Sequence, residues 1–200
     1  MTFDYIETRT LGDAAARLSE SGAAALGGGT DLLTLIAEGL LHPSTLVDLR
    51  GVARSREITD ANDGSIRIGA SARIHDLATD ARVRSRYPAL AEACEGVGTP
   101  ALRRMGTIGG NLCQRPRCWY YRRGIPCHKN GGHNCPAEKD GGESQYLAIL
   151  DGGPCHIVHP SDPAVALAAL DATIEVTRAR GENSAAVATR SVPIEEFFVL

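Results

Sequence analysis

The strongest structural signal in the sequence is the stretch Ala23-Ala24-Ala25-Leu26-Gly27-Gly28-Gly29-Thr30-Asp31-Leu32-Leu33. Ala23–Leu26 is an apolar run typical of a short buried strand, and three glycines follow it directly. The apolar pattern then predicts a helix over Asp31–Leu40 and a second strand over Thr45–Leu49. A strand, a glycine turn, a helix and a strand in this order predict a compact βαβ unit.

The glycine turn also indicates a binding function. Free N–H groups at the start of a helix carry partial positive charge, and adjacent glycines let a phosphate approach the backbone. Thr30 or Asp31 would serve equally well as the cap of a plain tight turn, so both interpretations stay open at this point. The spacing is neither G-x-G-x-x-G nor a P-loop, which excludes a Rossmann or NTPase assignment.

A second structural unit is expected to begin near residue 52. Arg56–Asp60 and Ser65–Gly69, joined by Asn62-Asp63-Gly64, predict a β-hairpin. We therefore divide the chain into a subdomain over 1–52 and a larger one over 53–200. Periodicity further predicts helices over Leu11–Leu18, Ile74–Asp80, Pro88–Glu95, Pro100–Met105 and Pro163–Leu170, strands over Phe3–Ile6, Tyr146–Leu150 and Cys155–Val158, and a hairpin from Thr173–Thr177 and Ala185–Ser191.

Composition limits the classes of function. The chain has 43% hydrophobic residues, 22% charged residues and a net charge of -3, values that give no reason to expect nucleic-acid binding. Residues 1–20 contain four acidic residues and no apolar run, so no signal peptide is expected on this chain. No stretch is long and apolar enough to cross a bilayer. We expect a cytoplasmic protein, or a periplasmic one exported together with a signal-bearing partner.

Four cysteines lie in a segment rich in Gly, Pro, Arg and Asn, with the spacing Cys118-x8-Cys127-x7-Cys135-x19-Cys155. Two disulfides are one interpretation, although small secreted scaffolds are usually much shorter chains. A zinc site is another, completed by His128 or His133 but lacking the usual paired C-x2-4-C ligands. Four thiolates on an irregular loop also suit a [4Fe–4S] cluster. Spacing alone leaves these alternatives open.

Three motifs together resemble a known family. They are Leu26–Leu33, the stretch Thr107-Ile108-Gly109-Gly110-Asn111-Leu112, and His159-Pro160-Ser161-Asp162 followed by the Ala- and Leu-rich run Ala166–Ala172. In order and separation they resemble the flavin-binding subunit of the molybdenum hydroxylases, the xanthine dehydrogenase family. The cysteine segment resembles the subgroup whose flavin subunit carries an extra [4Fe–4S] cluster. That subgroup includes the 4-hydroxybenzoyl-CoA reductase β subunit and the flavin subunit of periplasmic aldehyde oxidoreductases, and the latter is the more similar.

The resemblance implies an α+β fold of the vanillyl-alcohol oxidase (PCMH) type. In that fold a small βαβ subdomain accompanies a larger mixed α/β subdomain, here with an iron–sulfur loop inserted at about 113–156. The family continues into a C-terminal α+β domain, which we expect to be absent from this chain.

The resemblance also implies two cofactors and their binding residues. FAD would contact Leu26, Gly27, Gly28, Gly29, Thr30, Asp31, Leu32, Leu33, Thr107, Gly109, Gly110, Asn111, Ser161 and Asp162. The [4Fe–4S] cluster would be held by Cys118, Cys127, Cys135 and Cys155, with Cys113 packed beside the flavin turn instead. No residue of this chain is expected to be catalytic, because the cofactors carry the redox chemistry.

By the same resemblance, the chain would be an electron-transfer subunit of an aldehyde oxidoreductase-like molybdenum enzyme. Its partners would be a large molybdopterin-binding subunit and a small [2Fe–2S] subunit, and it would pass electrons between the iron–sulfur subunit and an external acceptor. A flavin subunit of the 4-hydroxybenzoyl-CoA reductase or xanthine dehydrogenase type is the alternative within the family. A non-redox zinc-binding module is the rival of a different class, and a self-contained flavin oxidase is a third interpretation.

Overall fold

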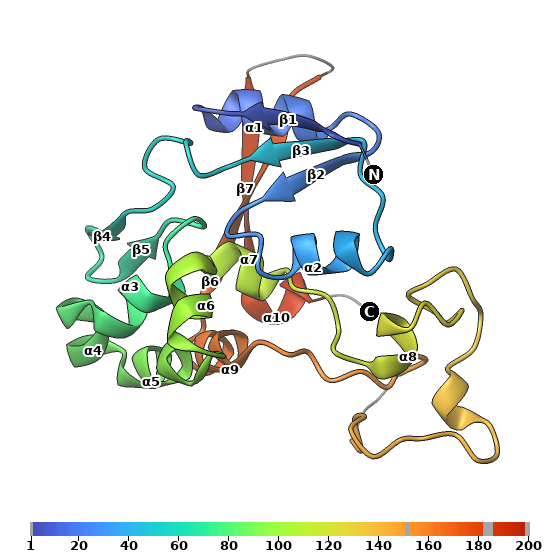
Figure 1. The fold of residues 1–200 in the computed structure, drawn as a ribbon. Coiled ribbons are helices and arrows are strands. Elements are labelled where there is room, and N and C mark those ends of the chain that lie inside the picture. The colour runs from blue at the N-terminus through green and yellow to red at the C-terminus, as the bar shows by residue number, and fades with distance from the viewer. Residues whose placement is uncertain (1, 151–152, 182–185, 199–200) are drawn as a thin grey trace.

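The first unit of the protein is a small parallel sheet with its connecting helices. The computed structural model describes residues 2–150, 153–181 and 186–198. Strands β1 (Asp4–Glu7), β3 (Thr45–Asp48) and β2 (Ala23–Leu26) form a parallel sheet in that order, joined through α1 (Leu11–Leu18) and α2 (Leu32–Ala37) (Figure 1). The βαβ unit predicted from the sequence is confirmed. Helix α2 is shorter than predicted, because Gly39 adopts a left-handed φ of 70° and ends the helix.

A hairpin and a layer of helices form the second unit. The predicted hairpin consists of β4 (Ile58–Asp60) and β5 (Ile66–Ile68). The helices that follow are α3 (Ile74–Thr79), α4 (Ala81–Arg86), α5 (Pro88–Gly96), α6 (Pro100–Met105), α7 (Ile108–Leu112) and α9 (Asp162–Ala169). Their apolar faces build the main core around Ile74, Leu77, Val83, Leu90 and Cys94, each at most 2% exposed.

Helix α4 was missed by the sequence analysis. Its sequence Ala-Arg-Val-Arg-Ser-Arg has only one strongly apolar residue, Val83, so helical periodicity is hidden. Asp80 starts the helix by accepting hydrogen bonds from the N–H groups of Arg82 and Val83.

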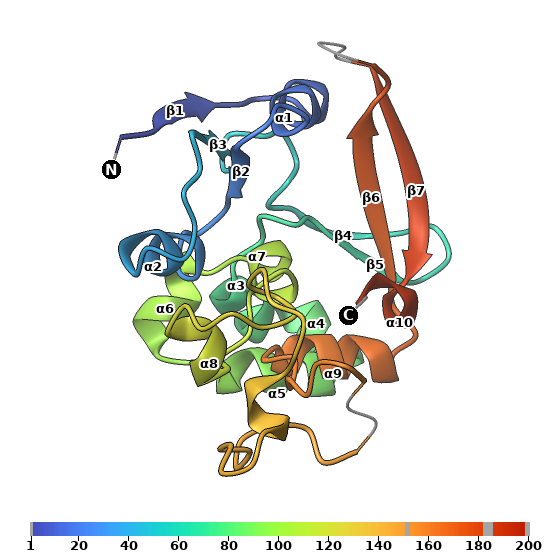
Figure 2. The ribbon, with the colours of Figure 1, turned by 90° about the vertical axis from the view of Figure 1, so that its right-hand side faces the viewer.

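A long hairpin connects the two units. Strands β6 (Thr173–Ala179) and β7 (Val187–Pro193) pair antiparallel and lead into α10 (Ile194–Phe197). Figure 2 shows the hairpin along one side of the molecule, from the level of α1 to that of α9. The predicted hairpin is thus confirmed, with a longer first strand and a second strand of the same length that begins and ends two residues later. Residues 182–185, which include the predicted first residue of the second strand, Ala185, lie outside the described residues.

The cysteine segment between α7 and α9 is largely irregular. It contains α8 (Trp119–Arg122) and the 3-10 helix η1 (Pro136–Glu138), and it projects from the rest of the molecule (Figure 1). The strands predicted over Tyr146–Leu150 and Cys155–Val158 are wrong. Tyr146, Ile149 and Leu150 are at least 80% exposed, and a single backbone hydrogen bond, from Ala148 N to His156 O, links the two stretches. Without a packed face or a ladder of hydrogen bonds, no strand forms.

The observed elements confirm an α+β architecture with mixed α/β content. Within the part of the chain that the structure describes, no helix has the length and apolar character needed to span a membrane.

Candidate functional site

A cleft of about 520 Å³ opens where the glycine turn after β2 faces the turn before α7. The cleft collects many residues that the sequence analysis assigned to a cofactor. Among those lining it are Gly27, Gly28, Gly29, Thr30, Asp31, Leu32, Thr107 and Gly110. Segments separated by about eighty positions in sequence therefore form its two walls.

The two turns touch each other through their backbones at Gly28. A Cβ atom at Gly28 would lie 1.9 Å from the carbonyl oxygen of Met105, which no side chain can tolerate. The adjacent Gly29 has a φ of 74°, a conformation that glycine adopts without strain. These two glycines are needed for close packing and for the path of the chain, and they leave backbone rather than side chains at the floor of the cleft.

The second turn is fixed by hydrogen bonds. Thr107 is buried, forms an isolated bridge with Arg73, and accepts a hydrogen bond from Gly110 N on its side chain at 3.2 Å. The N–H of Ile108 donates to the carbonyl of Ala72 at 2.9 Å. The turn is therefore held against the second unit before any ligand binds.

Six of the predicted flavin residues do not line this cleft: Leu26, Leu33, Gly109, Asn111, Ser161 and Asp162. Ser161 is only 1% exposed, and its hydroxyl donates to Asn111 Oδ1 at 2.5 Å while accepting from Ala164 N at 3.1 Å. In this arrangement Ser161 caps α9 and joins it to α7, so its visible role is to position the second turn.

Three residues that follow α7 also line the cleft: Cys113, Gln114 and Arg115. The sequence analysis placed Cys113 beside the flavin turn but did not assign Gln114 and Arg115. Gln114 Nε2 donates to the carbonyl of Pro160 at 3.0 Å, which holds this stretch beside α9. The only signal for them in the sequence was their position directly after the Thr107–Leu112 motif. Cys113 lies in the cleft and apart from the other cysteines of the segment, as the resemblance implied.

Asp31 links the glycine turn to the cysteine segment. Its carboxylate accepts hydrogen bonds from Arg115 N at 2.8 Å, Arg117 Nη1 at 2.6 Å and Arg122 Nη2 at 2.8 Å. Burial alone would raise the pKa of Asp31, but these donors outweigh it and hold the pKa below its ordinary value. Asp31 is therefore a charged anchor between two segments of the chain.

The four cysteines assigned to a metal centre line a single small cavity. Cys127, Cys135 and Cys155 are at most 9% exposed, and Cys118 is half-buried. Burial raises the pKa of the Cys155 thiol, and the neighbouring sulfurs of Cys135 and Cys127 raise it further. His128, Lys129 and His156 also line the cavity. Four convergent thiols without a carboxylate in the lining are a donor set suited to a soft thiolate-bound metal centre.

The cavity lined by the four cysteines is small, about 20 Å³. All six cysteines fall in the described part of the chain and are free thiols, so the disulfide interpretation is wrong. Over residues 2–150, 153–181 and 186–198, no group of three or more His, Cys, Asp or Glu side chains has the arrangement of a preformed metal site. The thiols share one cavity, but they would have to rearrange around a metal centre.

Fold and cleft together define an α+β cofactor-binding domain. Residues 1–200 match the family model described as the FAD binding domain in molybdopterin dehydrogenase. The chain belongs to this family, and FAD is the cofactor that the family binds.

Curated relatives agree with the family assignment. The chain is 36% identical over 200 residues to the aldehyde oxidoreductase FAD-binding subunit PaoB of Escherichia coli (strain K12), covering 98% of this chain and 60% of that subunit. It is also 36% identical over 110 residues to the xanthine dehydrogenase FAD-binding subunit of Escherichia coli O157:H7, covering 54% of this chain and 38% of that one. The chain thus spans at most 60% of the length of these two relatives.

Solved structures show the same fold. A chain of the carbon monoxide dehydrogenase from Hydrogenophaga pseudoflava superposes with a TM-score of 0.66 at 24% identity, covering 100% of this chain and 53% of that one. Quinoline 2-oxidoreductase from Pseudomonas putida 86 gives the same TM-score of 0.66 over 97% of this chain and 51% of its own.

Proposed function

We propose that this chain is the FAD- and [4Fe–4S]-containing electron-transfer part of a molybdenum-dependent aldehyde oxidoreductase. The observation that carries the proposal is the convergence of four cysteines on one cavity that lies next to the cleft of an FAD-binding domain. FAD and the cluster would supply the redox chemistry when bound, and no side chain of this chain is assigned a catalytic role.

The residues assigned to FAD fall into two groups. Gly27, Gly28, Gly29, Thr30, Asp31, Leu32, Thr107 and Gly110 would border the cofactor directly, and exposed backbone at the glycine turn suits its phosphates. Leu26, Leu33, Gly109, Asn111, Ser161 and Asp162 would support those walls from behind. We propose that the fold is of the vanillyl-alcohol oxidase (PCMH) type, with subdomains over 1–52 and 53–200.

Helix α2 supports a functional pairing of the two sites. Leu35 on α2 lines the cleft and also packs against Tyr121 and Cys127 of the cysteine segment. One layer of side chains therefore separates the cleft from the cysteines, which suits electron transfer between cofactors bound at the two sites. Cys118, Cys127, Cys135 and Cys155 would be the cluster ligands.

The aldehyde oxidoreductase type is favoured by the extent of the similarity. An alignment over 98% of this chain includes the cysteine segment, whereas the xanthine dehydrogenase alignment covers only 54%. By analogy with these subunits, we propose that the chain works beside a large molybdopterin-binding subunit and a small [2Fe–2S] subunit. A cytoplasmic and a periplasmic location are both compatible with that assembly.

The first test is an anaerobic absorption spectrum of the purified full-length protein, with flavin, iron, acid-labile sulfide and zinc measured on the same sample. We expect flavin bands and about four irons per chain, the stoichiometry of a [4Fe–4S] cluster. We also expect copurification with the molybdopterin and [2Fe–2S] subunits when the three are produced together.

Other results would contradict parts of the proposal. Flavin with zinc in place of iron would show that the cavity is a structural zinc site, because four thiolates also suit Zn²⁺. Zinc without flavin would leave a non-redox module. A protein that oxidises aldehydes alone, without its partners, would be a self-contained flavin oxidase.

A further inference from the structure

We infer that Arg115 binds the diphosphate of FAD, as a cationic side chain that the cysteine segment contributes to the flavin cleft. The inference rests on the proposal that the cleft between the two turns holds FAD. It adds a residue outside the glycine motifs, one positioned by Asp31 rather than by the local turn.

An anionic diphosphate in the cleft needs a positively charged side chain beside it. Among the described residues that line it, Arg115 is the only arginine or lysine, and Asp31 is the only carboxylate. Arg117 and Arg122 form ion pairs with Asp31 at 2.6 and 2.8 Å, so its negative charge is already compensated. The glycine turns offer N–H groups but no net charge, and Arg115 is left to balance an anionic diphosphate.

The backbone of Arg115 is fixed. Its N–H donates to Asp31 Oδ2 at 2.8 Å, and its carbonyl accepts from Arg117 Nη1 at 2.7 Å and from Arg122 Nη2 at 3.3 Å. These contacts tie the backbone of Arg115 to Asp31, which follows the glycine turn, and so hold the residue at the cleft. The position of its Cα is therefore set before a ligand arrives.

The guanidinium of Arg115 is uncommitted. Within the described part of the chain it has no hydrogen bond and no ion pair, and the side chain is exposed at the cleft. The guanidinium of Arg122, by contrast, already forms ion pairs with Asp31 and Glu38 and donates a hydrogen bond to the carbonyl of Pro116. A guanidinium with five donors and planar geometry binds phosphate oxygens through paired hydrogen bonds. Arg115 combines a fixed backbone with free donors at the place where a phosphate is expected.

The test measures FAD affinity of the full chain in its purified complex, after removal and readdition of the flavin. Arg115→Gln is expected to weaken FAD binding about tenfold to a hundredfold, because one or two charge-assisted hydrogen bonds are lost. Arg115→Lys should fall between wild type and Arg115→Gln, because it keeps the charge but loses the paired geometry.

Arg123→Gln is the matched control. Arg123 is also an exposed arginine of the cysteine segment, but its guanidinium lies 5.8 Å from the ring centre of Trp119 and does not line the cleft. This variant should bind FAD within about twofold of wild type. Both substitutions replace an exposed guanidinium, so a failure to fold is not expected for either.

Asp31 is tested as a positioning residue by a double-mutant cycle. Asp31→Ala should weaken FAD binding strongly in wild type but add little in the Arg115→Gln background, because Asp31 holds the backbone of Arg115 and acts on the diphosphate through the Arg115 guanidinium. Equal effects in both backgrounds would show that Asp31 acts on the cleft by another route.

The outcomes separate this inference from the proposed function. If the wild-type protein binds FAD and the Arg115→Gln variant binds it with equal affinity, the role of Arg115 is overturned and the flavin function stays intact. A loss of affinity in Arg123→Gln as large as that in Arg115→Gln also contradicts it, since the effect would then come from the charge of the cysteine segment as a whole and not from the cleft. Wild-type protein that takes up no FAD overturns both.

Discussion

At the scale of single residues, Gly28 is the position where the two walls of the cleft meet. A Cβ atom there would collide with the backbone carbonyl oxygen of Met105 at 1.9 Å, and neither a Cβ atom nor a backbone carbonyl can rotate away from the other. We predict that Gly28→Ala lowers the free energy of unfolding by about 1–3 kcal/mol, the usual cost of overpacking. It should also reduce the flavin content of the purified protein, since the turns must move apart.

Gly96 supplies the control for this prediction. It ends helix α5, is exposed, and a Cβ atom there would meet nothing within 4 Å. Gly96→Ala should leave flavin content unchanged and keep or slightly raise stability, because alanine favours helix. Thermal unfolding and flavin quantification of both variants test the pair, and a tolerated Gly28→Ala would contradict the contact between the turns.

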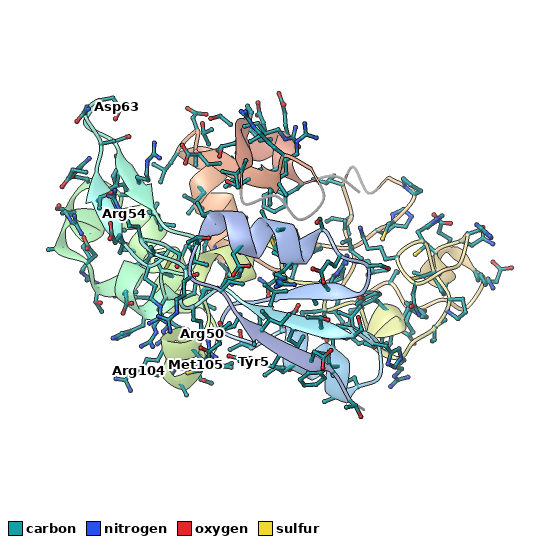
Figure 3. All side chains as sticks on the ribbon, turned by 90° about the horizontal axis from the view of Figure 1, so that it is seen from above. Tyr5, Arg50, Arg54, Asp63, Arg104 and Met105 are labelled. Carbon is teal, nitrogen blue, oxygen red and sulfur yellow. The ribbon has the colours of Figure 1, made fainter. Side chains whose placement is uncertain are left out.

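The surroundings of Asp48 lead us to predict that the free energy of unfolding depends on pH. It lies at the end of β3, is 5% exposed, and accepts hydrogen bonds from Tyr5 Oη and from Arg50 Nη2, the latter at 2.8 Å. Figure 3 shows Tyr5 and Arg50 close together beside the sheet. Burial alone would raise the pKa of Asp48, but the hydrogen bonds from Arg50 and Tyr5 outweigh it and lower the pKa to about 2 from 3.8.

Because the folded pKa is below the unfolded value, the ionised Asp48 stabilises the fold at pH above about 4. That contribution, about 2 kcal/mol, is lost as the pH falls from about 4 towards 2. We predict that Asp48→Asn is less stable than wild type at pH 6 and that the difference shrinks in this range. Urea unfolding of both proteins at several pH values measures it, and a difference independent of pH would contradict the ion pair.

At the scale of secondary-structure elements, the cysteine segment depends on contacts rather than on its own helices. Residues 113–156 contain only α8 and η1 among their described part, and the apolar contact that fixes the segment is that of Tyr121 and Cys127 with Leu35. A segment with so little regular secondary structure gains most of its order from tertiary contacts and from a bound metal.

We therefore predict that Cys127→Ser lowers the metal content and speeds proteolytic cleavage within this segment. The helical core around Leu77 and Leu90 should stay protected, since it does not include the segment. Cys113→Ser is the control, because Cys113 lines the cleft and not the cysteine cavity. Limited proteolysis with mapped cleavage sites and metal analysis test this. Equal metal loss in both variants would show that Cys113 is a ligand.

At the scale of the whole molecule, the hairpin β6–β7 joins the two proposed subdomains. It packs against α1 of the βαβ unit, while α10 packs on α9 of the helical layer (Figure 2). Arg67 on β5 forms an ion pair with Glu175 on β6 at 3.0 Å. Residues from the last part of the chain thus complete both units, and the boundary near residue 52 does not separate two independent bodies.

The sequence by itself determined the elements whose signals are local. The alternation of apolar runs and glycines between Ala23 and Leu49 was enough for the βαβ unit, because a short strand and a glycine turn depend on neighbouring residues. Three motifs were enough to identify the family, and the match of the family model over residues 1–200 confirms that assignment. Local apolar runs also misled: Tyr146–Leu150 looks like a strand but has no partner to pair with.

Only the tertiary structure decided which distant residues share a site. Asp31 and Arg115 are 84 positions apart, and their contact depends on how the cysteine segment packs on α2. The resemblance implied that four cysteines form one group and that Cys113 lies apart, but the cavity and the cleft that these residues line exist only in the packed chain. Periodicity reports the local conformation of the backbone, whereas the packing of side chains far apart in sequence is fixed only when the chain closes on itself.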